Sequence, residues 1–372
     1  VLYLKNLALL FNEVQIKNIE DEKYLKFKND YYNESKDYLR NLLHSEREKE
    51  IFKYVNWINK RKDEFGKYFA TPEQVLSSKF DVTVEECTSQ FQKDLYKYCR
   101  FLSSMPYAEY VGRRIKFLIR DNTYKNKPII GIAALGSSII KLKARESFLE
   151  WNDEHRISKI RDIMDLYTCI SIPPYNELLA GKLICYVMAS SEVRKIVTRK
   201  YSDSKLVALF TTTFYGKHSS QYNRIKFKDT LLYKKIGYTE GFGKSFVHKR
   251  LFENIKILLA ENEKYSRYKF DGGTNSSFRL IRDGIRKIDG NENLLLRHDV
   301  KKGIYCVALA NNFKEYLSGK DNNISYNNYS LEELVSFWKE RWLDKRIINS
   351  EIVERILNFE LGSVLPENLV NN

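Results

Sequence analysis

Short apolar runs bounded by turn residues dominate the middle of the chain, from Lys127 to Gly243. Three of them, at 129–135, 166–172 and 205–214, are rich in β-branched and aromatic residues, which is typical of buried strands. Between the second and third, residues 176–188 carry apolar side chains at helical spacing. Because a strand, a helix and another strand in succession form a crossover unit, this pattern predicts a sheet with helices on its faces.

An alternating segment at 111–121 precedes the first apolar run. Its apolar side chains alternate with basic ones, which predicts a half-exposed strand with a basic outer face. Turn-forming residues at 122–127 then lead into the strand at 129–135, so the two strands are expected to pair as a hairpin.

The ends of the chain have helical periodicity, with several sequence signals for helix starts. Thr71-Pro-Glu-Gln74 and Thr83-Val-Glu-Glu86 match capping boxes, which predicts helices over about 72–79 and 84–103. A third box at Ser330-Leu-Glu-Glu333 predicts a helix that carries Trp338 and Trp342. The run at 304–309 fits a strand or a helix equally well.

These elements together predict an α+β fold, with a central mixed β-sheet flanked by N- and C-terminal helical regions. We expect a helical N-terminal region at 1–104, an α/β core at 105–245 and a mostly helical C-terminal region at 246–372.

Composition points to a soluble globular protein. Of 372 residues, 43% are hydrophobic and 30% are charged, and no apolar run approaches the roughly 20 residues that cross a bilayer. We therefore expect no membrane partner. The five cysteines are far apart and form no C-x-x-C pair, which argues against a disulfide framework or a zinc site and favours a reducing cytoplasm. No ligand pattern for another metal is present.

The formal net charge is +15, and a surplus of this size attracts polyanions. An AT-rich genome, which inflates the lysine content, is the alternative explanation. The clustering of basic residues favours nucleic acid as the partner, with DNA ahead of RNA.

Four blocks in the core resemble the DruA family, the A component of the Druantia anti-phage system, whose domain also occurs in mobile-element proteins. The blocks cover about a third of the chain and follow the family's order. They are Ala144-Arg145-Glu146 with Trp151 to Arg156, Ile172-Pro173 with Asn176 to Ala180, Thr211 to Gly216 with Ser219 to Arg224, and Ile236 to Gly243. The resemblance implies a role in bacterial defence or in a mobile element, with other defence-system proteins as possible partners.

The same order of strand, loop, helix and strand, followed by Tyr233-Lys-Lys-Ile-Gly-Tyr238, is similar to the second half of the N-acetyltransferase (GNAT) fold. The resemblance implies a GNAT-like topology, in which helix N-terminal amides hold a cofactor pyrophosphate. Here the loop before that helix lacks a glycine-rich phosphate cradle, and Glu177 would repel a phosphate. The cofactor, if any, stays unknown.

Three residues are candidates for catalysis. Asp153 lies two positions before His155 and could raise its pKa, which would make the imidazole a general base. Tyr222 could join them in a pocket over the sheet. The alternative for Asp153 and His155 is the capped first turn of a helix.

For nucleic-acid binding, the candidates are basic residues of the core and a polar run without hydrophobic rhythm. Their hydroxyl, amide and guanidinium groups can bond to phosphates and base edges, and Tyr222 could stack on a base. They are Arg113, Arg114, Lys116, Arg120, Arg145, Arg156, Ser219, Ser220, Gln221, Tyr222, Asn223 and Arg224. A DNA-binding protein with a basic groove is therefore the leading hypothesis. A GNAT-like transferase, another nucleic-acid-modifying enzyme, and a structural adaptor of a defence complex are the alternatives.

Overall fold

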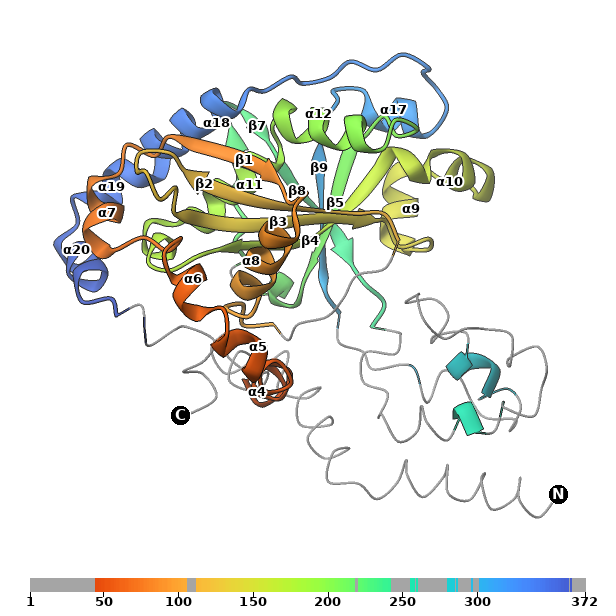
Figure 1. Ribbon diagram of the computed structural model, residues 1–372. Coiled ribbons are helices and arrows are strands. Elements are labelled where there is room, and N and C mark those ends of the chain that lie inside the picture. The colour runs from red at the N-terminus through yellow and green to blue at the C-terminus, as the bar shows by residue number, and fades with distance from the viewer. Residues whose placement is uncertain are drawn as a thin grey trace.

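The computed structural model describes residues 44–105, 112–217, 220–241 and 301–360, with isolated short stretches between 255 and 296 and residue 362 (Figure 1). The helical prediction for 1–43 and most of the helix expected after Phe246 lie outside the described residues.

A seven-stranded sheet forms the centre of the molecule (Figure 1). All neighbouring strands are antiparallel except β4 and β5, which are parallel. The mixed central sheet predicted for an α+β protein is thereby confirmed. In spatial order the strands are β1 (Val82–Glu86), β2 (Arg114–Asp121), β3 (Ile129–Ser137), β4 (Ile163–Ser171), β5 (Ala208–Thr213), β9 (Gly303–Ala308) and β8 (Tyr233–Tyr238).

Helices cover both faces of this sheet. One face carries the largest apolar cluster, against α7 (Pro72–Ser77), α11 (Ala180–Met188), α12 (Ser191–Lys200), α18 (Leu331–Trp338) and α20 (Ser350–Leu357). The opposite face carries two smaller clusters. One involves α4 (His44–Phe52), α5 (Val55–Asn59), α6 (Lys62–Gly66) and α8 (Gln90–Arg100), and the other α9 (Lys143–Leu149) and α17 (Phe313–Leu317).

Further helical elements lie between those that cover the sheet. They are α10 (Asp153–Lys159), α19 (Asp344–Ile347), and the short turns η1 (Ile160–Asp162), η2 (Tyr175–Leu178), η3 (Phe214–Lys217) and η4 (Lys339–Leu343).

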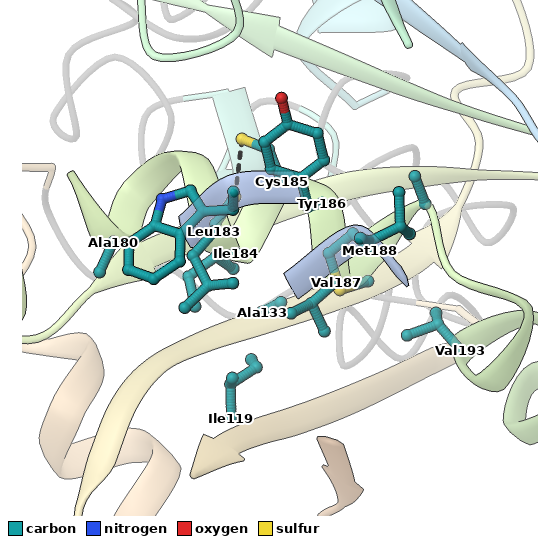
Figure 2. Close-up of a cluster of buried hydrophobic side chains, with 14 of the residues drawn as sticks. Ile119, Ala133, Ala180, Leu183, Ile184, Cys185, Tyr186, Val187, Met188 and Val193 are labelled. Atoms are coloured by element: carbon teal, nitrogen blue, oxygen red, sulfur yellow. Dashed lines mark hydrogen bonds between the residues drawn. The ribbon is translucent and has the colours of Figure 1, made fainter. Parts of the chain in front are cut away.

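Helix α11 is the centre of the larger apolar layer. Its residues from Leu183 to Met188 are fully buried. Figure 2 shows their side chains beside Ala133 of β3 and Ile119 of β2. Because each fully buried Leu or Ile contributes about 1.5–3 kcal/mol relative to exposure, this helix is a major source of stability.

The helix predicted over 84–103 is partly wrong. Residues 82–86 form strand β1, which pairs antiparallel with β2, and the helix starts only at Gln90. The β-branched residues Val82, Thr83 and Val84 favour a strand once a partner edge is available. Ser89 and Gln92 supply the capping box that opens the helix instead. The boxes at Thr71 and Ser330 are confirmed.

The hairpin between 111–121 and 129–135 is confirmed as β2 and β3. The prediction that its first strand is half exposed is wrong, because β2 lies between β1 and β3 and is covered on both faces. Only Arg114 at its start is exposed.

The undecided run at 304–309 is strand β9, which lies between β5 and β8. Strands β1 and β9 both belong to the central sheet although they lie outside 105–245. The division at 104 and 245 stays a prediction.

All five cysteines are buried and unbridged. None of the helices in the described ranges has the length and apolar character of a membrane span.

Gly131 tests the packing between β3 and α11. A Cβ atom there would lie 2.5 Å from Ile184 Cδ1 and 2.6 Å from the Ile170 carbonyl oxygen. We expect Gly131→Ala to lower the free energy of unfolding by about 1–3 kcal/mol, because a buried backbone must move. Gly66→Ala, which meets no atom within 4 Å, is the matched control and should be neutral or stabilising. Urea denaturation measures both, and equal stability of the two variants would contradict this packing.

Candidate nucleic-acid interface

Basic side chains gather around Tyr201, at the end of the sheet where β2 and β4 begin. The Tyr201 hydroxyl donates to the Arg114 carbonyl oxygen at 2.8 Å and accepts from the Arg114 amide at 2.9 Å. The Arg113 guanidinium lies 5.5 Å from the Tyr201 ring centre and donates to the Arg161 carbonyl oxygen at 3.0 Å. These contacts join β2, η1 and the end of α12.

We call this group the Tyr201 cluster. Its five basic residues are Arg113, Arg114, Arg161, Arg199 and Lys200, and all are exposed except Arg113, which is half-buried. The Lys200 ammonium lies 5.9 Å from the centre of the Tyr201 ring, and Arg199 is included as its neighbour in the last turn of α12. Two carboxylates accompany them: Asp203 lies 3.7 Å from Arg161, and Glu86 lies 2.6 Å from Lys200. Because five basic residues face only these two carboxylates, the cluster keeps a net positive charge.

Other predicted basic residues are turned inward. Arg120 is buried, lies 3.0 Å from Glu85 and donates to the Lys127 carbonyl oxygen. Arg156 is buried and lies 2.7 Å from Asp153. Lys116 is half-buried, 5.1 Å from the centre of the Tyr96 ring.

Arg145 is fully buried in α9, over the rings of Trp151 and Phe210 at 5.4 and 5.9 Å. It also donates to the Ile140 carbonyl oxygen at 3.2 Å, which holds the loop after β3. The Asp165 carboxylate binds the same loop through the Ser138 hydroxyl and the Ile139 amide. These contacts of Arg145 lie inside the protein and support the fold, so its guanidinium group is not at the surface where DNA would bind.

Burial raises the pKa of Asp165 to about 6, although its hydrogen bonds to Ser138 and Ile139 and the charge of Arg145 act in the opposite direction. The folded state thus resists ionisation of this carboxyl group.

The polar run 220–224 fills an opening in the sheet. Strands β4 and β5 pair at only three positions, from Ile163↔Ala208 to Asp165↔Phe210, and then separate. The Gln221 side-chain amide donates to the Cys169 carbonyl oxygen at 2.8 Å, which satisfies a backbone group of β4. Ser220 and Tyr222 are buried, while Arg224 is exposed.

Further hydrogen bonds fix this run from two sides. The Lys182 ammonium donates to the Gln221 and Asn223 carbonyl oxygens at 3.2 and 2.9 Å. The Tyr305 hydroxyl donates to the Asn223 side chain at 2.7 Å. Ser219 lies outside the described residues.

The three catalytic candidates have separate environments. Asp153 is exposed, and its bond to Arg156 lowers its pKa. The amide of His155 donates to the Asn152 side chain, as in a helix cap. Tyr222 stacks on Tyr233, and burial raises its pKa well above the usual value. Among the described contacts, none joins Tyr222 to the other two.

The N-terminus of α11, where the resemblance to the GNAT fold would place a pyrophosphate, is covered by the chain itself. The Trp338 indole donates to the Leu179 carbonyl oxygen at 3.4 Å, and Arg346 donates to the Glu177 carbonyl oxygen at 2.7 Å. A Cβ at Gly181 would lie 2.9 Å from the Gln221 side-chain oxygen. These residues do not fit a bound pyrophosphate.

A cavity of about 380 Å³ lies between the loop after β4 and the residues following α20. It is lined by Pro173, Asn176, Glu177, Arg355, Asn358, Phe359 and Glu360 and contains none of the catalytic candidates. Over the described ranges, no three His, Cys, Asp or Glu side chains gather as metal ligands would.

Comparison with known proteins agrees with the motifs in the core. A sequence model of the family described as "Druantia protein DruA" matches residues 33–319. The chain belongs to the DruA family. A Druantia protein DruA of Escherichia coli (strain UMEA 4076-1) is 28% identical over 331 residues, which are 85% of this chain and 81% of the relative. No solved structure matches the chain.

Sequence reasoning missed three members of the Tyr201 cluster in this DruA-family chain: Arg161, Arg199 and Lys200. Their positions could have identified them, because Arg199 and Lys200 lie in the last turn of a helix and Arg161 lies two residues before strand β4. Side chains at element ends stay exposed more readily than those within a covered strand.

Asp165 gives a pH-dependent prediction for this DruA-family protein. Since its folded pKa is raised from 3.8 to about 6, the folded state binds more protons between these values, and stability falls as pH rises from about 4 to 6. Asp165→Asn should remove this slope and add at most about 3 kcal/mol above pH 6. Urea denaturation across this pH range measures it. Asp203→Asn, at an exposed site, is the control, and an unchanged slope in Asp165→Asn would contradict the assignment.

Proposed function

We propose that this chain is a DNA-binding component of a bacterial anti-phage defence system or mobile element, acting in the cytoplasm. The observation that carries the proposal is the Tyr201 cluster, where basic residues from three elements meet at one end of the sheet. Membership of the DruA family supports the defence role and makes other Druantia proteins its expected partners.

The chemistry of the cluster suits phosphate groups. Guanidinium groups bind phosphate oxygens through paired hydrogen bonds, and the contacts of Tyr201 hold the backbone of Arg114 in place. Because such contacts are made to the sugar–phosphate backbone, they would position the protein on DNA without reading its sequence.

We also propose a GNAT-like topology for the core. The parallel pair β4 and β5, with the loop and α11 between them, supports it. The covered N-terminus of α11 favours a binding function for this core over acetyl transfer. The fold would then serve as a scaffold for surface contacts.

DNA binding at two salt concentrations tests the proposal. We expect low-salt affinity for duplex DNA that falls steeply with salt, because each phosphate contact contributes about 0.9 to the slope of log K against log salt. Arg161→Ser combined with Arg199→Ser should lower the slope by roughly 1–2 for the same reason. Fluorescence anisotropy with labelled DNA measures the affinities.

Lys345→Ser provides the matched control, since Lys345 is exposed in α19 and is not a member of the cluster. It should retain the wild-type affinity and slope. Absence of wild-type binding to single- or double-stranded DNA or RNA at low salt would refute the proposal. Partner complexes that survive nuclease treatment would support the adaptor alternative instead.

A further inference from the structure

A small two-stranded ribbon follows the polar run and is separate from the central sheet. Its strands are β6 (Lys226–Phe227) and β7 (Thr230–Leu231), and the pair Phe227↔Thr230 closes a turn of two residues, Lys228 and Asp229. We call residues 224–231 the ribbon.

Alternate residues anchor the ribbon to the molecule. Ile225 and Phe227 are buried in the largest apolar cluster. The Phe227 ring lies 4.8 Å from that of Tyr329 and 5.3 Å from that of Phe337. The Tyr186 hydroxyl donates to the Lys226 carbonyl oxygen at 2.6 Å. The ribbon is therefore held firmly against the largest apolar cluster, with its alternate residues left at the surface.

The other alternate residues, Arg224, Lys226 and Lys228, are all exposed. None of them forms a salt bridge with another described residue. Leu231, opposite Lys226 in the register, is 44% exposed. Lys226 and Leu231 therefore share one side of the ribbon by register. Arg224 at its start and Lys228 in its turn are exposed beside them, and the Lys228 ammonium lies 5.2 Å from the centre of the Phe227 ring.

Two of these cations occupy a backbone conformation that L residues rarely adopt. Arg224 has φ +64° and Lys228 has φ +52°, and only eight non-glycine residues in the described part of the chain have positive φ. Glycine or asparagine would meet the turn geometry at lower cost. Strain that recurs within five residues and places basic side chains outward points to a functional surface.

We propose that the ribbon enters the major groove of duplex DNA. This inference rests on the proposed DNA-binding function and assigns it a groove-reading element. The major groove of B-form DNA, about 12 Å wide, admits a two-stranded ribbon. The three cations would contact phosphates or guanine edges, and Leu231 would contact a thymine methyl group.

The geometry selects B-form DNA over double-stranded RNA. The major groove of an A-form RNA helix is too deep and narrow for side chains to read. Contacts made by the ribbon should therefore contribute to binding of duplex DNA and much less to binding of duplex RNA.

The double variant Arg224→Gly/Lys228→Gly separates binding from folding. Because glycine relieves the positive-φ strain, its melting temperature should equal or exceed that of the wild type. Its affinity for duplex DNA should fall at least about fivefold, with little change on duplex RNA. Fluorescence anisotropy with labelled duplexes of both kinds measures this.

Lys127→Gly is the matched control, because Lys127 is also basic, exposed and at positive φ (+45°), but lies in the β2–β3 turn. It should keep the wild-type affinity. If the wild type binds DNA and the double-glycine variant binds equally well, the proposed role of the ribbon is refuted, while the proposed role of the Tyr201 cluster is unaffected. An equal loss on duplex DNA and duplex RNA would overturn groove entry. Failure of the wild type to bind any nucleic acid would instead refute the proposed function.

Discussion

The separation of β4 from β5 after three paired residues is the constraint on which the centre of this molecule depends. Backbone groups that leave a sheet ladder in a buried region must find other partners. Gln221 bonds to the Cys169 carbonyl oxygen, and the Thr211 hydroxyl donates to the Leu166 carbonyl oxygen at 2.8 Å. The polar run 220–224 therefore completes the sheet with side-chain hydrogen bonds.

This arrangement connects the interior to the surface. The run that fills the opening continues directly into the ribbon, so the bonds from Lys182 and Tyr305 that hold the run also fix the position of the ribbon. A groove-binding element on a rigid base would lose less conformational entropy on association than a flexible loop. The polar groups of the core thus hold the ribbon in place.

The sequence predicted the elements that depend on local signals. Apolar runs located β3, β4 and β5, and capping boxes located the starts of α7 and α18. It missed β1, because Thr83 and Glu86 imitate a helix cap, and only pairing with β2 decides the conformation. It also could not assign 304–309, since insertion between β5 and β8 is a long-range event that leaves no periodic signal.

The basic residues show why net charge alone could not locate a binding site. Arg120 and Arg145 belong to the same surplus of charge as Arg161 and Arg199, yet their guanidinium groups bind carbonyl oxygens and lie over aromatic rings inside the protein. Arginine allows both uses, because its planar, weakly hydrated group stacks on rings as readily as it pairs with phosphate. Arg120 is enclosed within a covered strand, whereas Arg199 lies in the last turn of a surface helix. The pattern of apolar residues around an arginine therefore separates buried from exposed arginines better than the net charge does.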